Sequence, residues 1–244
     1  MRRKLVAGNW KMNGSLAALA ELDVIAAAAG GKVDVAVALP ATLIAPAAAR
    51  APGLAIGAQD VHAADAGAHT GCASAAMIGE AGAVFSIVGH SERRADQYET
   101  DADVRGKAEA LRRRGLRAIL CVGETLAERE AGRAEAVVTA QLAASLPEGA
   151  AADWLSIAYE PVWAIGTGKT ATVADVEAMH AAIRARLHVS IGYEAEAMRI
   201  LYGGSVTAEN AAELLHASDV DGALVGGASL TAAKFLPIVK AAAG

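Results

Sequence analysis

The sequence LSIAYEPVWAIGTGK, at residues 155–169, indicates both a fold class and a type of chemistry. Its first five residues are largely apolar, which is typical of a strand buried on both faces. Glu160 follows where this strand ends, and Pro161 favours an extended conformation for it. A loop with two glycines comes next, and then Thr172 and Asp175 have the spacing of a helix capping box. A carboxylate between a buried strand and a loop that can cover it predicts an acid or a base.

The rest of the chain repeats this order of strand and helix. Short apolar runs predict strands at 5–7, 33–39, 54–58, 84–88, 118–122, 155–159, 200–202 and 223–225. Helices are predicted between them, among them 15–29, 101–114, 134–146, 173–187 and 207–216, and a last helix is predicted after the glycines 226–227, ending at about Ala242. Eight such units in 244 residues favour a closed barrel over an open doubly wound sheet. We therefore expect an α/β fold, a single-domain (β/α)₈ barrel with a parallel eight-stranded core, over residues 1–244.

Composition limits the classes of partner. Apolar residues make up 54% of the chain but only two are Phe, so small aliphatic side chains must fill most of the core. The net charge of −5 argues against a general nucleic-acid or membrane-surface binder, which would need a basic face. No long uncharged apolar run predicts a membrane-spanning helix. Cys72 and Cys121 lie far apart without metal-type spacing, which favours a reducing, cytoplasmic compartment.

Unusual polar residues follow the predicted strands. Asn9 and Lys11 follow the first strand, His90 follows the fourth and Glu160 the sixth. In a barrel of parallel strands these positions all face the carboxyl-terminal end, where active sites lie. Each residue alone has an ordinary structural explanation, such as a solvated lysine, a core histidine or a carboxylate in a surface ion pair. Their common position favours a site instead.

The residue types also indicate roles. Lys11 would place a positive charge beside a phosphate or a developing oxyanion. His90 stands at a predicted helix start, which disfavours the imidazolium form and predicts a neutral ring. Glu160 is the best candidate base, because burial raises the basicity of a carboxylate. For Glu92 and Glu124 we expect structural roles, with Glu92 in an ion pair with Lys11.

Two pairs of glycines follow the seventh and eighth strands, at 203–204 and 226–227. Glycine lets backbone N–H groups approach an anion closely, and the start of a following helix favours negative charge. Phosphate sites in (β/α)₈ barrels often lie after these two strands. With Gly166 in the covering loop and Ser205 after the first pair, the sequence predicts a site for one phosphate group.

These segments together are similar to one known family. The similarity rests on six motifs: NWKMN at 9–13, GHSERR at 89–94, CVGE at 121–124, the 159–169 stretch, YGGSV at 202–206 and LVGGASL at 224–230. They resemble triosephosphate isomerase in the order of the motifs and over nearly the whole chain.

The resemblance implies that the chain interconverts dihydroxyacetone phosphate and D-glyceraldehyde 3-phosphate, a reaction of glycolysis and gluconeogenesis. By the same resemblance, Glu160 moves a proton between the two carbons and His90 moves protons between the oxygens of an enediolate. Lys11 would stabilise charge and Asn9 would orient the intermediate. The phosphate would lie at Gly166, Ser205, Gly226 and Gly227, under a lid formed by residues 161–170. The resemblance implies no metal and no organic cofactor.

The third loop departs from the family pattern. The family usually carries an aromatic residue followed by Thr-Gly-Glu there, in a loop that inserts into a second subunit. This chain has His69, Thr70 and then Cys72 instead of the acid, and Asp60 replaces a usual Asn. We expect a homodimer formed through the loop around Thr70. Two other readings are another barrel enzyme acting on a small phosphorylated substrate and a non-catalytic phosphate-binding protein.

Overall fold

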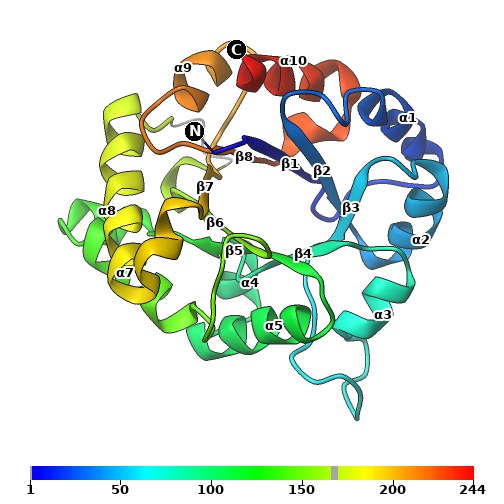
Figure 1. Cartoon of the computed structure of the whole chain (residues 1–244), viewed down its shortest axis with the longest axis horizontal. Helices are drawn as coiled ribbons and strands as arrows, with labels where there is room; N and C mark the ends of the chain where they lie inside the picture. The colour runs from blue at the N-terminus through cyan, green and yellow to red at the C-terminus, as the bar shows by residue number, and fades with distance from the viewer. Residues whose placement is uncertain (1, 166–169) are drawn as a thin grey trace.

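Eight parallel strands close into a barrel in the computed structural model, which describes residues 2–165 and 170–244 (Figure 1). The strands are β1 (Leu5–Asn9), β2 (Asp34–Leu39), β3 (Ala55–Ala58), β4 (Phe85–Val88), β5 (Arg117–Val122), β6 (Leu155–Tyr159), β7 (Arg199–Tyr202) and β8 (Gly222–Val225). Strand β1 pairs with β2 on one side and with β8 on the other, which closes the barrel. The predicted fold is therefore confirmed, and the predicted strand ends lie within a few residues of the observed ones.

Helices surround the barrel (Figure 1). They are α1 (Ala20–Ala26), α2 (Ala41–Arg50), α3 (Ala75–Glu80), α4 (Ser91–Asp96), α5 (Asp101–Arg113), α6 (Leu126–Glu130), α7 (Ala134–Ser145), α8 (Val173–Ile191), α9 (Ala211–Leu215) and α10 (Ala232–Ala243). Short 3₁₀ turns occur at η1 (Ala17–Leu19), η2 (Val162–Ala164), η3 (Gly192–Glu196) and η4 (Gly227–Leu230). The capping box predicted at Thr172 is present at the start of α8, where Thr172 and Asp175 satisfy each other's backbone N–H groups.

Three predicted helices differ from the observed ones. The helix expected at 15–29 is a 3₁₀ turn followed by α1, although Ser15 Oγ still accepts the Ala18 N–H at 3.2 Å. The helix expected from Thr207 begins only at Ala211, because Asn210 Oδ1 accepts the Thr207 N–H at 2.8 Å and holds a turn there. The chain after Gly226 first forms η4 and only then α10.

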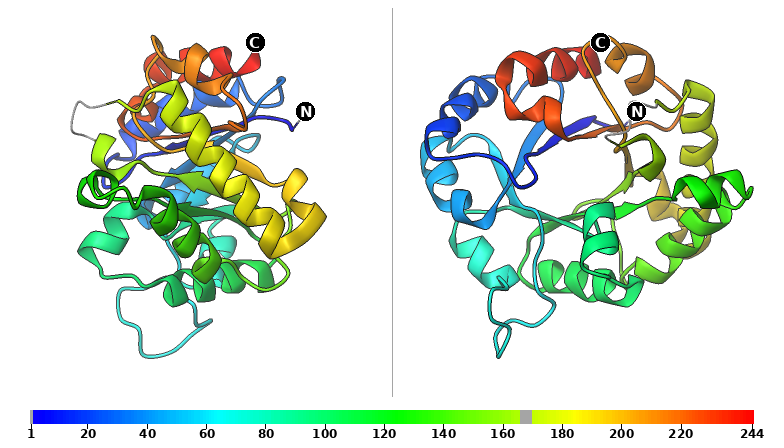
Figure 2. Two further views of the ribbon diagram at one scale, coloured as in Figure 1. Left: turned by 90° about the vertical axis from the view of Figure 1, so that its left-hand side faces the viewer. Right: turned by 180° about the vertical axis from the view of Figure 1, so that it is seen from behind.

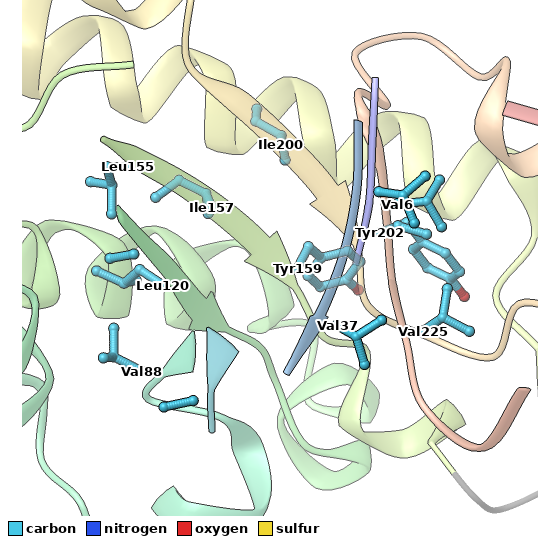
Figure 3. Packing of buried hydrophobic residues seen from close by; sticks show 14 of the residues in the cluster. Val6, Val37, Val88, Leu120, Leu155, Ile157, Tyr159, Ile200, Tyr202 and Val225 are labelled. Atoms are coloured by element: carbon cyan, nitrogen blue, oxygen red, sulfur yellow. The ribbon is translucent and has the colours of Figure 1, made fainter. Parts of the chain in front are cut away.

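The core consists of two layers on either side of the barrel wall. The outer layer packs strand side chains against the helices; Figure 3 shows part of it, including Val6, Leu120, Ile157 and Ile200. The inner layer fills the barrel itself and contains Ala7, Ala36, Ala38, Phe85, Ile87, Ile119, Cys121, Ala158, Leu201 and Leu224. Because four of its ten members are alanines, the inner layer occupies little volume. The two layers are separate because successive side chains along each strand point to opposite faces of the barrel wall.

Within residues 2–165 and 170–244, none of the helices combines the length and the apolar character that crossing a membrane requires.

Candidate active site

A cavity of about 230 Å³ lies at the carboxyl-terminal end of the barrel. It is lined by seven of the predicted site residues, namely Asn9, Lys11, His90, Glu160, Ser205, Gly226 and Gly227. The eighth, Gly166, lies outside the described residues. The barrel therefore brings together side chains from β1, β4, β6, β7 and β8, as expected for polar residues that follow parallel strands.

Glu160 lies almost completely buried at the end of β6, with 1% of its surface exposed. Its backbone N–H donates to Val122 O at 2.8 Å, which extends the sheet by one residue. Its carboxylate accepts two hydrogen bonds from Ser91, one from the backbone N–H at 2.9 Å and one from the hydroxyl at 3.2 Å. The His90 Nε2 atom lies 2.9 Å from Oε1. The candidate base is thus held by the first residues of α4 and not by a basic residue at the barrel rim.

Glycines on both sides give Glu160 its space. A Cβ atom on Gly123 would lie 1.9 Å from Glu160 O, and one on Gly203 would lie 2.9 Å from its Cγ. The Gly203 N–H donates to Tyr159 O at 2.7 Å. Gly203, which the sequence suggested as part of a phosphate site, therefore uses its N–H in the sheet and makes room for the candidate base.

The pKa of Glu160 is shifted in the opposite direction to the expected one. Burial alone would raise it, as predicted, but the interactions with His90 and Ser91 outweigh burial and lower the pKa below its usual value. The prediction considered burial without these partners, because Ser91 and His90 come from a segment 69 residues away in the sequence. The carboxylate is therefore ionised while it keeps these contacts.

His90 is the N-cap residue of α4, as the predicted helix start required. Its Nδ1 accepts the Glu92 N–H at 3.3 Å, which only an unprotonated Nδ1 can do, so the proton it shares with Glu160 lies on Nε2. Burial opposes protonation, but Glu160 favours it more strongly, and the pKa of His90 is raised. The expected lowering by the helix terminus is thus outweighed by Glu160 as long as the two side chains remain paired.

Lys11 and Asn9 are held in place by each other and by a residue that the sequence did not single out. Lys11 has a positive φ of 52°, and its N–H donates to Asn9 Oδ1 at 3.0 Å. Gln59 Nε2 donates to Lys11 O at 2.9 Å and to Asn9 Oδ1 at 3.2 Å. The Lys11 ammonium pairs with Glu92 Oε1 at 2.6 Å, which confirms the expected ion pair. These contacts fix a cation and an amide on the cavity wall; the position of Gln59 directly after β3 was the available signal.

The opposite wall is built from the segments after β7 and β8. Ser205 Oγ donates to Ala164 O at 2.9 Å, which ties this wall to the turn that precedes residue 166. A Cβ atom on Gly226 would lie 3.4 Å from Lys11 Cε, whereas one on Gly227 would meet nothing within 4 Å. Gly227 begins the turn η4, where the first backbone N–H groups lack acceptors within the helix. A small anion near these residues would also lie near the Lys11 ammonium.

Glu124, for which the sequence suggested a structural role, is not among the residues that line this cavity. Its carboxylate accepts hydrogen bonds from the Tyr159 hydroxyl at 3.0 Å and from Trp163 Nε1 at 2.8 Å. The Arg129 guanidinium lies over the Trp163 ring, 4.5 Å from its centre, and also pairs with Asp175 in the first turn of α8. This group, which we call the Glu124 cluster (Glu124, Tyr159, Trp163, Arg129 and Asp175), joins the start of the predicted lid to the segments before and after it.

Among the described residues, no group of three or more His, Cys, Asp or Glu side chains is arranged to hold a metal ion.

Known proteins match this chain along nearly its whole length. The family model for triosephosphate isomerase matches residues 4–242. The triosephosphate isomerase of Ruegeria sp. (strain TM1040) is 56% identical over 244 residues, with 100% of this chain and 99% of that protein covered. The Afipia carboxidovorans enzyme of the same name is 57% identical, with 98% and 97% covered. The crystal structure of triosephosphate isomerase from Bartonella henselae superposes with a TM-score of 0.92 at 47% identity, covering 98% of both chains. The arrangement of the cavity and these similarities together place the chain in the triosephosphate isomerase family.

Proposed function

We propose that Glu160, His90, Lys11 and Asn9 carry out the interconversion of dihydroxyacetone phosphate and D-glyceraldehyde 3-phosphate, the isomerase reaction of this family. The observation that carries this assignment is the placement of a buried carboxylate, an imidazole, an ammonium group and an amide around one cavity. An isomerisation through an enediolate requires a base for carbon, a proton donor for oxygen and a positive charge near the developing oxyanion.

Glu160 starts the reaction by taking a proton from the hydroxymethyl carbon of dihydroxyacetone phosphate. The electrons of that C–H bond form a carbon–carbon double bond, and the carbonyl electron pair moves to oxygen to give the enediolate. His90 moves the proton of the first carbon's hydroxyl to the oxygen of the second carbon, and Glu160 returns its proton to the second carbon, which leaves an aldehyde at the first carbon. No atom is gained or lost in the sequence of steps.

His90 transfers protons to and from the oxygen atoms of the enediolate. Its Nε2 carries the proton that it shares with Glu160, and both side chains line the cavity. When the substrate separates the two side chains, His90 loses the partner that raises its pKa, and burial and the helix terminus then favour the neutral ring. A neutral imidazole can donate to one enediolate oxygen and accept from the other.

The same separation activates Glu160. Burial raises the pKa of Glu160, and the contacts with His90 and Ser91 lower it more strongly. If the carboxylate exchanges these hydrogen bonds for a position beside the substrate carbon, burial remains and its basicity rises. Lys11 and the amide of Asn9 stabilise the negative charge on the enediolate, and Ser205, Gly226, Gly227 and Gly166 hold the phosphate. By the resemblance to the family, residues 161–170 would form the lid that excludes water, and residues 166–169 of this segment lie outside the described residues.

A coupled assay with glyceraldehyde 3-phosphate tests this proposal, comparing the native chain with Glu160→Gln. We expect rapid turnover by the native chain and a loss of about 10²–10⁴-fold in the variant, which is the contribution of a positioned base. Undiminished turnover by Glu160→Gln would remove Glu160 from the mechanism. Binding of 2-phosphoglycolate, an anion that resembles the enediolate, checks that the variant keeps its cavity.

We further propose that the chain is a homodimer formed through the loop around Thr70. This loop precedes α3 and projects from the barrel (Figure 1). A second cavity, of about 530 Å³, lies between Lys11 and the loop and is also lined by Met12, Thr70 and Cys72. Met12 is 96% exposed, although a large apolar side chain beside a catalytic lysine is better covered.

The departures from the family pattern have local explanations in this loop. His69 stacks on His62, with ring centres 3.8 Å apart, so the residue that replaces the aromatic side chain packs within its own subunit. Asp60, which replaces the usual Asn, pairs with Lys107 at 2.7 Å and with Arg93 at 2.9 Å. Sedimentation velocity between micromolar and nanomolar concentration tests the proposal. A fully active monomer at micromolar concentration would refute it.

We also propose a cytoplasmic location. Cys72 is exposed and Cys121 is buried, and both are free thiols, the usual state of cysteine in a reducing compartment. Fractionation of the source cells tests this location, and recovery of the isomerase activity outside the cytoplasmic fraction would contradict it.

A further inference from the structure

A cavity of about 500 Å³ lies at the amino-terminal end of the barrel, opposite the active site. It is lined by residues at the starts of the strands, among them Leu5, Asp34, Ala55, Arg117 and Arg199. The left-hand view of Figure 2 shows the barrel from the side, with the N-terminus at this end. The inner layer of the barrel lies between the two cavities. The isomerase reaction proposed above uses none of these residues.

The cavity exists because the strands place small side chains at this end of the barrel. Ala36 and Ala55 are neighbours in the register of β2 and β3, and both line the cavity. The Phe85 ring packs so closely on Gly57 that a Cβ atom there would lie 2.4 Å from the ring. The ring is thereby held on one wall, and with Ile119 it gives the cavity an apolar surface. A larger residue at position 36 or 55 would fill the space.

Four arginines and two aspartates line the same cavity: Arg2, Arg3, Arg117, Arg199, Asp34 and Asp153. Asp34 is shared between Arg3 at 2.5 Å and Arg199 at 2.6 Å. Burial would raise the pKa of Asp34, but its bonds with the two arginines outweigh burial and lower it, so the carboxylate is ionised. One carboxylate thus faces two guanidinium groups.

Arg117 is the cation that the protein leaves available. It is the first residue of β5 and is exposed. Within residues 2–165 and 170–244, its guanidinium makes neither a hydrogen bond nor an ion pair. Arg2, in contrast, forms ion pairs with Asp219 at 2.7 Å and with Asp221 at 2.8 Å. The result is an excess of positive charge at the mouth of an apolar cavity, in a chain whose net charge is −5.

We propose that this cavity binds a small organic anion, with its carboxylate or phosphate head on Arg117 and its flat apolar body against Phe85 and Ile119. A guanidinium group offers paired N–H donors that match the oxygens of either head group. Ligand cavities of roughly 300–1,000 Å³ are typically apolar with a few polar groups that orient the ligand, and this cavity has that composition. Arg199, paired with Asp34, lines the same cavity as Arg117.

Isothermal titration calorimetry with naphthalene-2-carboxylate and 2-naphthyl phosphate tests this proposal. Both titrations are made with 2-phosphoglycolate at a concentration that occupies the active site. We expect one molecule to bind per chain, and the tighter of the two probes identifies the preferred head group. The neutral naphthalene-2-carboxamide should bind about tenfold more weakly or worse, because it lacks the charge-assisted hydrogen bonds.

Three variants locate the binding. Arg117→Gln should weaken binding of the anion about tenfold or more, while Arg133→Gln, an exposed arginine on α7's N-terminal side, should leave it unchanged. Ala55→Leu should abolish binding by filling the cavity. Isomerase activity and Tm verify that each variant is folded. The proposal is overturned if neither anion binds, if the carboxamide binds equally well, or if Arg117→Gln and Arg133→Gln behave alike.

Discussion

Glu160 and Glu124 follow neighbouring strands of the same barrel and are both buried, yet they are held in opposite ways. Glu160 accepts from Ser91 and stands beside the His90 ring in a cavity, and its pKa is lowered. Glu124 accepts two neutral donors, Tyr159 and Trp163, in a packed region; burial is its largest influence and its pKa is raised. Both carboxylates are buried, but the contacts with His90 and Ser91 outweigh burial at Glu160, whereas burial outweighs the contacts of Glu124 with Tyr159, Trp163 and Arg129.

The difference also separates two functions. The partners of Glu160 can be exchanged for a substrate, because they line an open cavity. The Glu124 cluster instead joins the start of the predicted lid to the segments before and after it, through contacts among its own side chains. One carboxylate is placed to act on a ligand and the other to hold the protein around it.

Removing one partner from each carboxylate gives the largest expected contrast. His90→Asn should lower kcat by about 10²–10⁴-fold, because it removes the proton donor to the enediolate oxygens. Tyr159→Phe removes one hydrogen bond to Glu124 and should lower kcat less than about tenfold, with a loss of about 1 kcal/mol in the free energy of unfolding. Steady-state kinetics and urea unfolding measure both effects. Equal losses of kcat in His90→Asn and Tyr159→Phe would contradict the different roles assigned to Glu160 and Glu124.

Glu124→Gln should have a smaller effect than His90→Asn. The amide oxygen can still accept from Tyr159 and Trp163, but the new NH₂ group is placed where Glu124 Oε2 has no partner among the described residues. We expect a destabilisation of about 1–3 kcal/mol, the cost of a buried unsatisfied group, and a modest change in kcat. Denaturant unfolding with parallel activity assays provides the measurement. A loss of activity as large as that of Glu160→Gln would show that Glu124 takes part in the chemistry.

The smallest expected effect is a difference in the pH dependence of stability. The folded-state pKa of Glu160 lies below its unfolded value, so the stability that it contributes is lost as pH falls through the folded pKa. The folded-state pKa of Glu124 lies above its unfolded value, so its contribution is lost as pH rises from the unfolded toward the folded pKa. Scanning Tm from acidic to neutral pH should show less acid sensitivity in Glu160→Gln and a smaller decline above the ordinary Glu pKa in Glu124→Gln. Each 1 kcal/mol corresponds to about 2–4 °C in a chain of this size. The reverse pattern would mean that the partners assigned to the two carboxylates are wrong.

Local sequence signals predicted much of this arrangement. Unbroken apolar runs located the strands, and the Thr172–Asp175 spacing located the start of α8. Helix α6 was missed, although Thr125 and Glu128 form the same kind of capping box there. That signal is short and the helix has only five residues, so hydrophobic periodicity could not support it.

The contacts that set the chemistry could not be predicted in this way. The pairing of His90 with Glu160 depends on the register in which eight strands close, which no local pattern contains. For the same reason the sequence indicated the position of Glu160 but gave the wrong direction for its pKa. Gln59 was missed because a lone glutamine after a strand acquires meaning only when Asn9 and Lys11 lie beside it.

The most direct test of the account follows the proton that Glu160 is proposed to carry. The chain is incubated with dihydroxyacetone phosphate in D₂O, and deuterium at the carbon positions of substrate and product is measured by NMR for native protein, Glu160→Gln and Glu124→Gln. We predict rapid incorporation at carbon by the native protein and by Glu124→Gln, and almost none by Glu160→Gln, although that variant still binds 2-phosphoglycolate. Incorporation by Glu160→Gln at the native rate would contradict the assignment of Glu160 as the base.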